Sequence, residues 1–443
     1  MAGSPRSIRP LLAARRLLEK VPRRELLLLA GAMVLAFAIV VAYVVTNRFQ
    51  PLAGDGPEYD MQGTFFTMGK WWWSSTPFGV EHASAWKAPL YPAWVGFWYE
   101  LLGPSVTRVG YVQSLLAPLT VFLTWLLARR LFDPAVAIAA AFVVAVFPLA
   151  WEYYGLLYPE ALAIPLTMLI VLVFLDRQPS PGRAIGLGAL IGICLLVRPT
   201  SFFLFAGVAV AWWIAAGPRR GLALTALSIT VAALVVAPWT IRNFVVADGF
   251  IPISVQDAAS YGTFNEVSAS DPDLPYAWRS HVIASDELLE NGKPPTDAEL
   301  RSELQSRAFD FIRENPTSVA EAFFWNGLSR YWDVRRPGWA LGEAPAEGRS
   351  RAVTTVGLGM YYVLLPLAIA GLWRARRRRE LVLPILALAA AASLVFTVQG
   401  GTRYRAPLEP VIVILACSLV APLTRRGARR EEPRGEAGAV AGS

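Results

Sequence analysis

The feature that most constrains this sequence is a succession of apolar segments separated by short runs of arginine. The first apolar segment extends from Leu26 to Thr46, and similar segments recur almost to the end of the chain. Of the 443 residues, 55% are hydrophobic and 17% are charged, and the mean hydropathy is +0.43. Soluble domains carry about a quarter of charged residues. The sequence therefore predicts an all-α polytopic membrane protein, because helices satisfy their own backbone groups in lipid.

The basic residues orient the predicted spans. They cluster in short segments between apolar stretches, as at Arg129-Arg130 and Arg219-Arg220. Lys and Arg concentrate in cytoplasmic loops of membrane proteins. The net charge of +8 is thus explained by membrane orientation, and we expect no nucleic-acid partner. About ten spans with both chain ends in the cytoplasm fit this pattern. The first seven are expected at 26–46, 110–128, 134–150, 161–175, 185–197, 201–216 and 222–238, and three more follow residue 351.

The expected organisation is a bundle of about ten transmembrane helices with interfacial helices and a small extracytoplasmic helical region. We divide the chain into a basic cytoplasmic tail (1–25), a transmembrane core (26–238) that includes the first extracytoplasmic loop (47–108), an extracytoplasmic loop region (239–351), C-terminal transmembrane helices (352–423) and a disordered cytoplasmic tail (424–443).

Both long loops contain helix signals. In the first loop, Pro57 begins a helix-compatible stretch that reaches the tryptophans at 71–73, and Pro89–Leu102 is too short to span a membrane and predicts an interfacial helix. In the second loop, Thr296 and Glu299 have the spacing of a capping box at the start of a helix. A second helix is expected after Asn315-Pro316.

Three carboxylates lie within six residues just after the first span: Asp55, Glu58 and Asp60. Carboxylates beside lipid are costly unless water, a cation or a substrate receives them. Like charges and burial raise a carboxyl pKa, which suits a base that takes a proton from a hydroxyl. The alternative is that Gly56-Pro57 starts a helix and the acids lie at its N-terminus because of the helix dipole. Glu160, at the outer start of the fourth span, is a further acidic candidate.

Basic groups on the outer side form a second set. Lys87 lies in Trp86-Lys87-Ala88-Pro89-Leu90-Tyr91-Pro92, where it either meets an anionic head group or extends along the membrane surface. Outer arginines run against the positive-inside bias, and guanidinium groups suit phosphate. The catalytic candidates are Asp55, Glu58 and Glu160, and the substrate-binding candidates are Tyr59, Asp60, Lys87, Tyr91, Arg198, Arg242, Arg403 and Arg405.

Metal and nucleotide signals are weak. His82 and His281 are the only histidines and have no metal-ligand spacing, so the metal remains unknown, although a divalent ion is possible. No glycine loop of the nucleotide-binding type is present. Cys194 and Cys417 both lie in apolar segments, which indicates no disulfide framework.

The order of these motifs resembles the GT-C integral-membrane glycosyltransferases, especially the protein O-mannosyltransferase and aminoarabinose transferase group. It consists of the acidic group, Lys-x-Pro-Leu-Tyr-Pro, the outer glutamate, Arg-Pro, Pro-Trp-x-x-Arg-Asn and Arg-Tyr-Arg-x-Pro. The resemblance implies transfer of a sugar from a polyprenyl-phosphate donor with inversion. It also implies that Asp55 is the base, that Lys87 contacts the donor phosphate and that Glu160 is the second acidic position.

The chain departs from that pattern in two places. The usual acidic pair is spread out as Asp55-Gly56-Pro57-Glu58, so Glu58 or Asp60 remains an alternative base. Trp86 stands where aminoarabinose transferases have a metal-binding glutamate, which leaves metal dependence open.

These observations predict a plasma-membrane glycosyltransferase with an extracytoplasmic active site. Its partners would be the donor lipid and a glycan, lipid or protein acceptor. The alternative from another class is a polyprenyl-lipid-sugar flippase or transporter. Transporters place polar groups near the bilayer midplane in repeated, broken helices. Here the polar groups gather at the outer side, and no repeat is evident. A structural partner in an envelope assembly is a third interpretation, based only on the long second loop.

Overall fold

The computed structural model describes residues 21–48, 51–75, 77–175, 178–283, 288–289, 293–334 and 338–419, and the two predicted tails lie almost wholly outside these ranges. It is an all-α membrane protein, as expected. Among the described residues, five helical segments are long and apolar enough to cross a membrane: Arg23–Asn47, Val106–Leu131, Pro199–Ala216, Pro218–Val246 and Arg351–Arg374.

Helices occur at all ten positions where a span is expected. They are α2 (Arg23–Asn47), α5 (Val106–Gln113) with α6 (Leu116–Leu131), α7 (Pro134–Val146), α8 (Glu160–Phe174), α9 (Pro181–Val197), η4 (Pro199–Phe203) with α10 (Leu204–Ala216), α11 (Pro218–Val246), α16 (Arg351–Arg374), α17 (Arg379–Val395) and α18 (Glu409–Cys417). Several are shorter than a bilayer is thick. Short helices of this kind leave irregular backbone at their ends, and η3 (Glu152–Gly155) and η8 (Thr402–Leu408) are two such segments.

Small residues allow the bundle to pack closely. Gly192 on α9 faces α11, where a Cβ atom at this position would lie 2.8 Å from Val235 Cβ. Within a membrane such small residues let helix backbones approach one another. The outward faces keep large apolar side chains, among them Val34 and Leu234, at 67% and 66% exposure. These faces suit a lipid environment.

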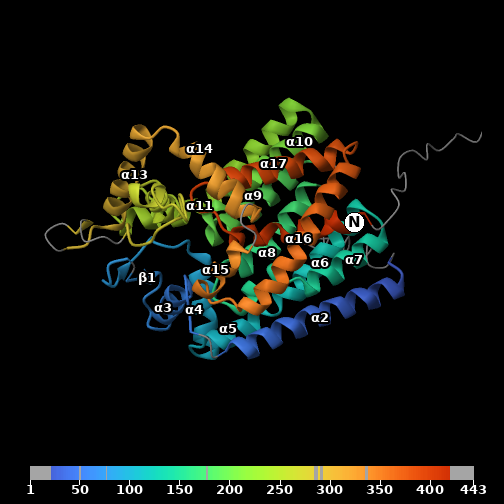
Figure 1. The fold of residues 1–443 in the computed structure, drawn as a ribbon, viewed down its shortest axis with the longest axis horizontal. Coiled ribbons are helices and arrows are strands. Elements are labelled where there is room, and N and C mark those ends of the chain that lie inside the picture. Colours follow the sequence, from blue (N-terminus) through green and yellow to red (C-terminus); the bar gives the residue numbers. More distant parts are fainter. Residues whose placement is uncertain are drawn as a thin grey trace, which may run out of the picture.

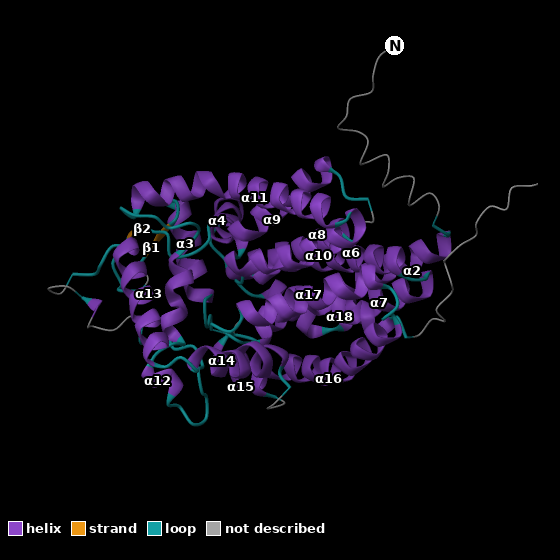
Figure 2. Cartoon of the chain, turned by 90° about the horizontal axis from the view of Figure 1, so that it is seen from above, coloured by secondary structure: helices purple, strands orange, loops and turns teal. Residues whose placement is uncertain are grey.

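The two long connections lie together at one end of the bundle (Figures 1 and 2). The first connection contains α3 (Gly56–Thr67), a two-stranded antiparallel hairpin of β1 (Trp73–Ser74) and β2 (His82–Ala83), and α4 (Leu90–Leu102). The second contains η5 (Val255–Gly262), α12 (Glu266–Ala269), α13 (Asp297–Glu314), α14 (Ser318–Ala322), the π-helix η7 (Phe323–Arg330) and α15 (Trp339–Ala346).

The local predictions for these connections are mostly confirmed. The capping box of Thr296 and Glu299 is present, and α13 buries Leu300, Leu304 and Ala308. Helix α4 occupies the predicted interfacial position. The stretch after Pro57 was predicted too long, because α3 ends at Thr67 and Trp72 has a φ of 57°. A helix cannot continue through a left-handed residue, and the chain turns into the hairpin there.

Candidate active site

Asp55 is the N-cap residue of α3, and two cations hold its side chain. Lys87 Nζ lies 3.1 Å from Asp55 Oδ1, and Arg403 Nη2 lies 2.7 Å from Asp55 Oδ2. Lys87 comes from the turn before α4 and Arg403 from η8. Pro57 at the first turn of α3 begins the helix and leaves the carboxylate at its N-terminus. The acidic segment therefore does start a helix, and it also meets distant cations.

Glu160, at the first position of α8, binds the same arginine from the other side. Arg403 Nε donates to Glu160 Oε1 at 2.7 Å, and Arg198 Nη1 donates to that oxygen at 2.5 Å. The Glu160 side chain is fully buried, and its second oxygen has no hydrogen-bond partner among the described residues. The Arg403 guanidinium thus bridges Asp55 and Glu160. We call Asp55, Glu58, Lys87, Glu160, Arg198 and Arg403 the ion cluster.

Glu58 is the third acid of the cluster. Its Oε2 lies 3.2 Å from Lys87 Nζ, so this lysine joins both acids of the first connection. The Lys87 side chain is only 3% exposed. Its ammonium also lies 5.3 Å from the centre of the Tyr59 ring, and Tyr59 packs edge-on against Tyr91. The two tyrosines thus form a buried wall that fixes the lysine.

Burial and charge give the two acids of α3 different pKa values. Burial raises the pKa of the Asp55 carboxyl, but the charges of Lys87 and Arg403 outweigh it and hold that pKa well below its ordinary range. Burial raises the pKa of Glu58 to about 7 against the opposing charge of Lys87, and the Asp55 charge adds to the increase. Asp55 is therefore ionised at neutral pH, while Glu58 titrates near neutrality.

Aromatic rings surround the arginines of the cluster. The Arg403 guanidinium lies 4.3 Å from the centre of the Tyr158 ring, and Arg198 lies 4.5 Å from that of Tyr404. The Tyr158 hydroxyl donates to the Ala53 carbonyl at 3.1 Å. Sequence analysis missed Tyr158 and Tyr404 as site residues. The only available signal was their position beside Glu160 and Arg403 in the chain.

Five of the predicted site residues lie outside the ion cluster: Tyr59, whose ring lies beside Lys87, and four others. Asp60 accepts a hydrogen bond from Tyr99 on α4, and Tyr91 donates to Gln113 at 3.0 Å. Arg242 donates to the Ser84 carbonyl at 2.7 Å and so holds the hairpin. Arg405 is fully buried, and its Nε donates to Glu409 at 2.6 Å within η8 and α18.

No group of three or more His, Cys, Asp or Glu side chains among the described residues is arranged to hold a metal ion. The carboxylates of the ion cluster are instead surrounded by the cations of Lys87, Arg198 and Arg403. These cations can neutralise a substrate phosphate, and the carboxylates can accept a proton.

One protein-family model matches part of the chain. Residues 86–241 match the family described as dolichyl-phosphate-mannose-protein mannosyltransferase. The resemblance to the GT-C glycosyltransferases is therefore confirmed, and the match supports glycosyl transfer at a membrane in general. The matched segment contains Lys87, Glu160 and Arg198, whereas Asp55 and Arg403 lie outside it.

Solved structures of two membrane proteins are similar to this chain. The oligosaccharyltransferase AglB from Archaeoglobus fulgidus, in complex with an inhibitory peptide and a dolichol-phosphate, is 16% identical with a TM-score of 0.49, over 88% of this chain and 50% of that chain. ArnT from Cupriavidus metallidurans bound to undecaprenyl phosphate is 14% identical with a TM-score of 0.39, over 89% of this chain and 77% of that chain. The chain thus spans about half the length of the archaeal protein. No curated protein sequence matches this chain.

Proposed function

We propose that the protein is an inverting glycosyltransferase that moves a sugar from a polyprenyl-phosphate donor to an acceptor hydroxyl at the extracytoplasmic face of the plasma membrane. The observation that carries this proposal is the bridging of Asp55 and Glu160 by one buried guanidinium, that of Arg403. Distant segments thereby bring acids and cations into one site. The description of the matched family names a dolichyl phosphate, which is a polyprenyl phosphate.

The cations of the ion cluster can stabilise the leaving group, which is the polyprenyl phosphate. When the bond between the anomeric carbon and the phosphate oxygen breaks, the electron pair leaves on the polyprenyl phosphate. Lys87, Arg198 and Arg403 would stabilise that developing charge, as preorganised donors do in other active sites. Side chains held by carboxylates and aromatic rings need little reorganisation at that moment.

The carboxylates of the ion cluster can take the proton of the acceptor hydroxyl. The hydroxyl oxygen attacks the anomeric carbon from the face opposite the phosphate, and its proton passes to a carboxylate. While it is paired with Lys87 and Arg403, Asp55 is a weak base, because these cations stabilise its ionised form. A donor phosphate would draw both cations toward itself and leave Asp55 more basic. We therefore propose that donor binding activates Asp55.

The first prediction concerns Asp55→Asn. This variant should keep its binding of polyprenyl phosphate and lose about 10²- to 10⁴-fold in kcat, the usual contribution of a general base. Transfer would be measured in membranes supplied with a polyprenyl-phosphate sugar. Glu81→Gln is the matched control, because Glu81 lies in the same connection, is 51% exposed and pairs with Lys70. Full turnover by the Asn variant would remove Asp55 as the base, and the same change at Glu58 and Asp60 would then test the alternatives.

The second prediction concerns Lys87→Ala. A charge-assisted hydrogen bond contributes about 1.5–3 kcal/mol, so the KM for the donor should rise by about 10- to 100-fold. Lys70→Ala is the control, since Lys70 is 39% exposed and contacts Glu81 rather than the ion cluster. An unchanged donor KM in the Lys87 variant would contradict phosphate binding by this residue.

The flippase alternative makes a different prediction. Wild-type protein in vesicles would then move the lipid-linked sugar between leaflets without forming a new glycosidic bond. The ion cluster lies at the ends of helices rather than within them, since Asp55 caps α3, Glu160 begins α8 and Arg198 follows α9. That position favours transfer over translocation.

A further inference from the structure

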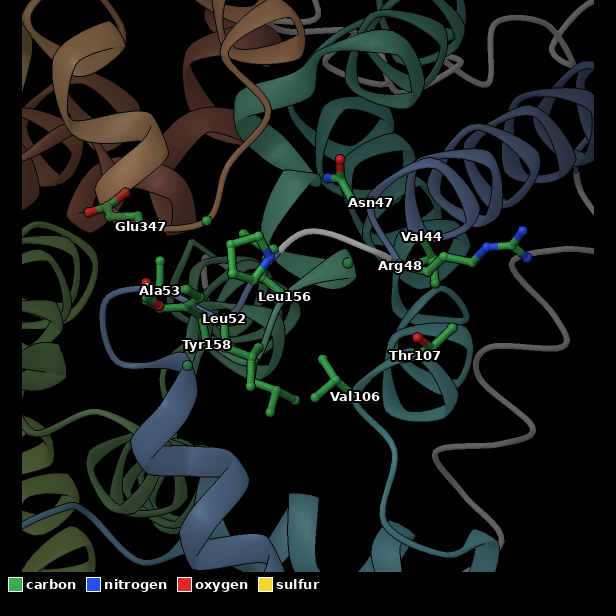
Figure 3. Close-up of a pocket in the computed structure, with 15 residues that line it drawn as sticks. Val44, Asn47, Arg48, Leu52, Ala53, Val106, Thr107, Leu156, Tyr158 and Glu347 are labelled. Atoms are coloured by element: carbon green, nitrogen blue, oxygen red, sulfur yellow. Dashed lines mark hydrogen bonds between the residues drawn. The ribbon is translucent and has the colours of Figure 1, made fainter.

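A pocket of about 150 Å³ lies beside the ion cluster and takes no part in the mechanism above. Figure 3 shows its lining, which comes from the ends of α2 and α5, from residues 51–56 and 155–158, and from residues 347–348. Glu347 lies on the same side as Ala53 and Tyr158, and Thr107 lies on the opposite side. We call this space the α2–α5 pocket.

Tyr158 separates the pocket from the ion cluster. Its side chain lines the pocket, its hydroxyl donates to the Ala53 carbonyl, and its ring stacks on Arg403. Ala53 and Gly56 also line the pocket, and Asp55 lies between them in the chain. The backbone that carries the proposed base therefore forms one wall of the pocket. A molecule bound there would be a neighbour of Asp55.

The polar atoms of the pocket call for a hydroxylated occupant. The Asn47 side chain lines the pocket and bonds to the Tyr43 hydroxyl, and its amide group has a further donor and an acceptor for an oxygen-bearing occupant. Glu347 accepts from Arg349 Nε at 2.7 Å, and Arg349 Nη1 donates to Glu152 at 3.1 Å. This buried arginine fixes Glu347 in the pocket wall, where the carboxylate can accept from a hydroxyl.

Apart from Arg48 and Thr107, the remaining lining is mostly apolar. Val44, Val106 and Leu156 line the pocket between its two polar sides. The same two helices turn Val45 and Tyr111 outward, at 38% and 39% exposure. Both helices belong to segments that can cross a membrane, so lipid surrounds these outward side chains. The pocket is thus walled by helices whose other faces contact lipid.

We propose that the α2–α5 pocket binds the acceptor, and that this acceptor is a lipid-borne molecule with a hydroxylated head group. The head lies at Asn47, Tyr158 and Glu347, and the apolar part lies along Val44 and Val106. The role of this molecule as the acceptor rests on the proposed glycosyltransferase function. Binding in the pocket, by contrast, can be measured without turnover.

The test is protection of an introduced cysteine. Both native cysteines are buried, so Thr107→Cys in lipid nanodiscs gives a defined site for N-ethylmaleimide. The probe is decyl maltoside below its micelle concentration, which has one alkyl chain and a hydroxylated head. At ten times its Kd it should slow alkylation by about tenfold, because about a tenth of the pockets stay empty. Ser302→Cys, at an exposed position of α13 outside the pocket lining, is the control and should react at an unchanged rate.

Three outcomes overturn the proposal: no protection by decyl maltoside, equal protection by maltose alone, or protection only by a serine-containing peptide. Val106→Cys, on the same wall, replaces Thr107→Cys if that variant fails to fold. As a second measurement, Thr107→Trp narrows the pocket and should raise the KM for a lipid-borne acceptor without changing the binding of undecaprenyl phosphate. Protection of the Thr107→Cys variant, together with no sugar transfer by the wild-type protein, would refute the transferase proposal and leave the binding site standing.

Discussion

Glu58 and Asp55 are three residues apart and share Lys87, yet they differ in charge at neutral pH. Asp55 has a second cation in Arg403, whereas Glu58 pairs with Lys87 and otherwise accepts from two neutral groups, the Trp86 side chain and the amide of Gln62, at 3.4 Å from its Oε1. One additional guanidinium thus separates an ionised carboxylate from one that titrates near pH 7. Two carboxylates in different protonation states are a common basis for assigning acid and base roles.

The raised pKa of Glu58 predicts that the free energy of unfolding depends on pH. Burial raises the folded-state pKa of this residue to about 7, above the unfolded value of 4.5. The stabilisation is therefore complete below about pH 4.5 and is lost as pH rises through 7, a contribution of about 3 kcal/mol. Glu58→Gln removes it, so the Tm of the wild type relative to this variant should fall between pH 5 and pH 8 in detergent. Glu81→Gln, at an exposed site, should show no such change. A constant difference for Glu58→Gln would contradict the raised pKa.

The sequence indicated which charged residues need a partner, but not which groups they pair with. Asp55, Lys87, Glu160 and Arg403 stand out because charged groups beside apolar segments are unusual. The same argument also selected Arg242 and Arg405, which bind a carbonyl and Glu409 instead. Composition reveals that a charge needs a partner, but the partner's identity depends on tertiary contacts.

At the scale of elements, the turn before α3 depends on Gly54. Its φ is +58°, in the left-handed region, and a Cβ atom there would collide with the Tyr158 hydroxyl. Only glycine adopts this conformation without penalty and leaves room for the tyrosine. The turn, Tyr158 and Arg403 are therefore coupled by contact.

The prediction is that Gly54→Ala destabilises the protein more than Gly69→Ala. Both glycines have positive φ, but a Cβ at Gly69 has no atom within 4 Å. Gly69→Ala should cost about 1–2 kcal/mol from backbone strain alone. Gly54→Ala should cost more, because Tyr158 must also move from Ala53 and Arg403. Thermal unfolding of the two variants in the same detergent measures the difference. Equal losses of stability would show that the Tyr158 side chain moves aside without cost.

Elements of the bundle were predictable and those of the connections only partly so. A helix lies at each position where hydropathy predicts a span, and five of the described segments are long and apolar enough to cross a membrane. The capping box located the start of α13, since that signal is local. The β1–β2 hairpin and the π-helix Phe323–Arg330 have no comparable signal. Both depend on what packs against them.

At the scale of the whole molecule, Asp297 fastens the second connection to the first. This residue begins α13, and its Oδ2 accepts from Ala85 N at 2.6 Å and from Ser84 Oγ at 2.9 Å. His82 Nε2 lies 3.1 Å from Asp297 Oδ1. Arg242 at the end of α11 binds the Ser84 carbonyl in the same region. Three distant segments therefore meet beside the turn that carries Lys87.

Asp297→Asn should loosen this junction. The amide group cannot accept all three hydrogen bonds, so hydrogen exchange should increase in 82–85 and at the start of α13. The hydrogen bond to Asp297 also raises the pKa of His82, which burial and Arg242 oppose. That stabilisation is complete below the unfolded pKa of about 6.5 and is lost as pH rises through the folded value. Exchange corrected for intrinsic rates should therefore increase with pH in the wild type but not in the variant. Glu303→Gln, on an exposed position of α13, is the control.

Contacts at this scale lay beyond the reach of one sequence. Arg349 and Glu152, Arg403 and Asp55, and Asp297 and Ala85 are each far apart in the chain. Their pairing depends on how short helices stack, which hydropathy does not determine. Sequence therefore predicted that acids and cations would meet, and the fold determines which ones do.

The bridge formed by Arg403 has a consequence for turnover. Its positive charge is shared by Asp55 and Glu160, so the protein carries internal substitutes for the phosphate it is proposed to bind. After transfer, these carboxylates compete with the spent carrier lipid for the same guanidinium. Re-formation of the internal contacts would then favour departure of the carrier, and a site attractive enough to capture a charged lipid would also be able to release it.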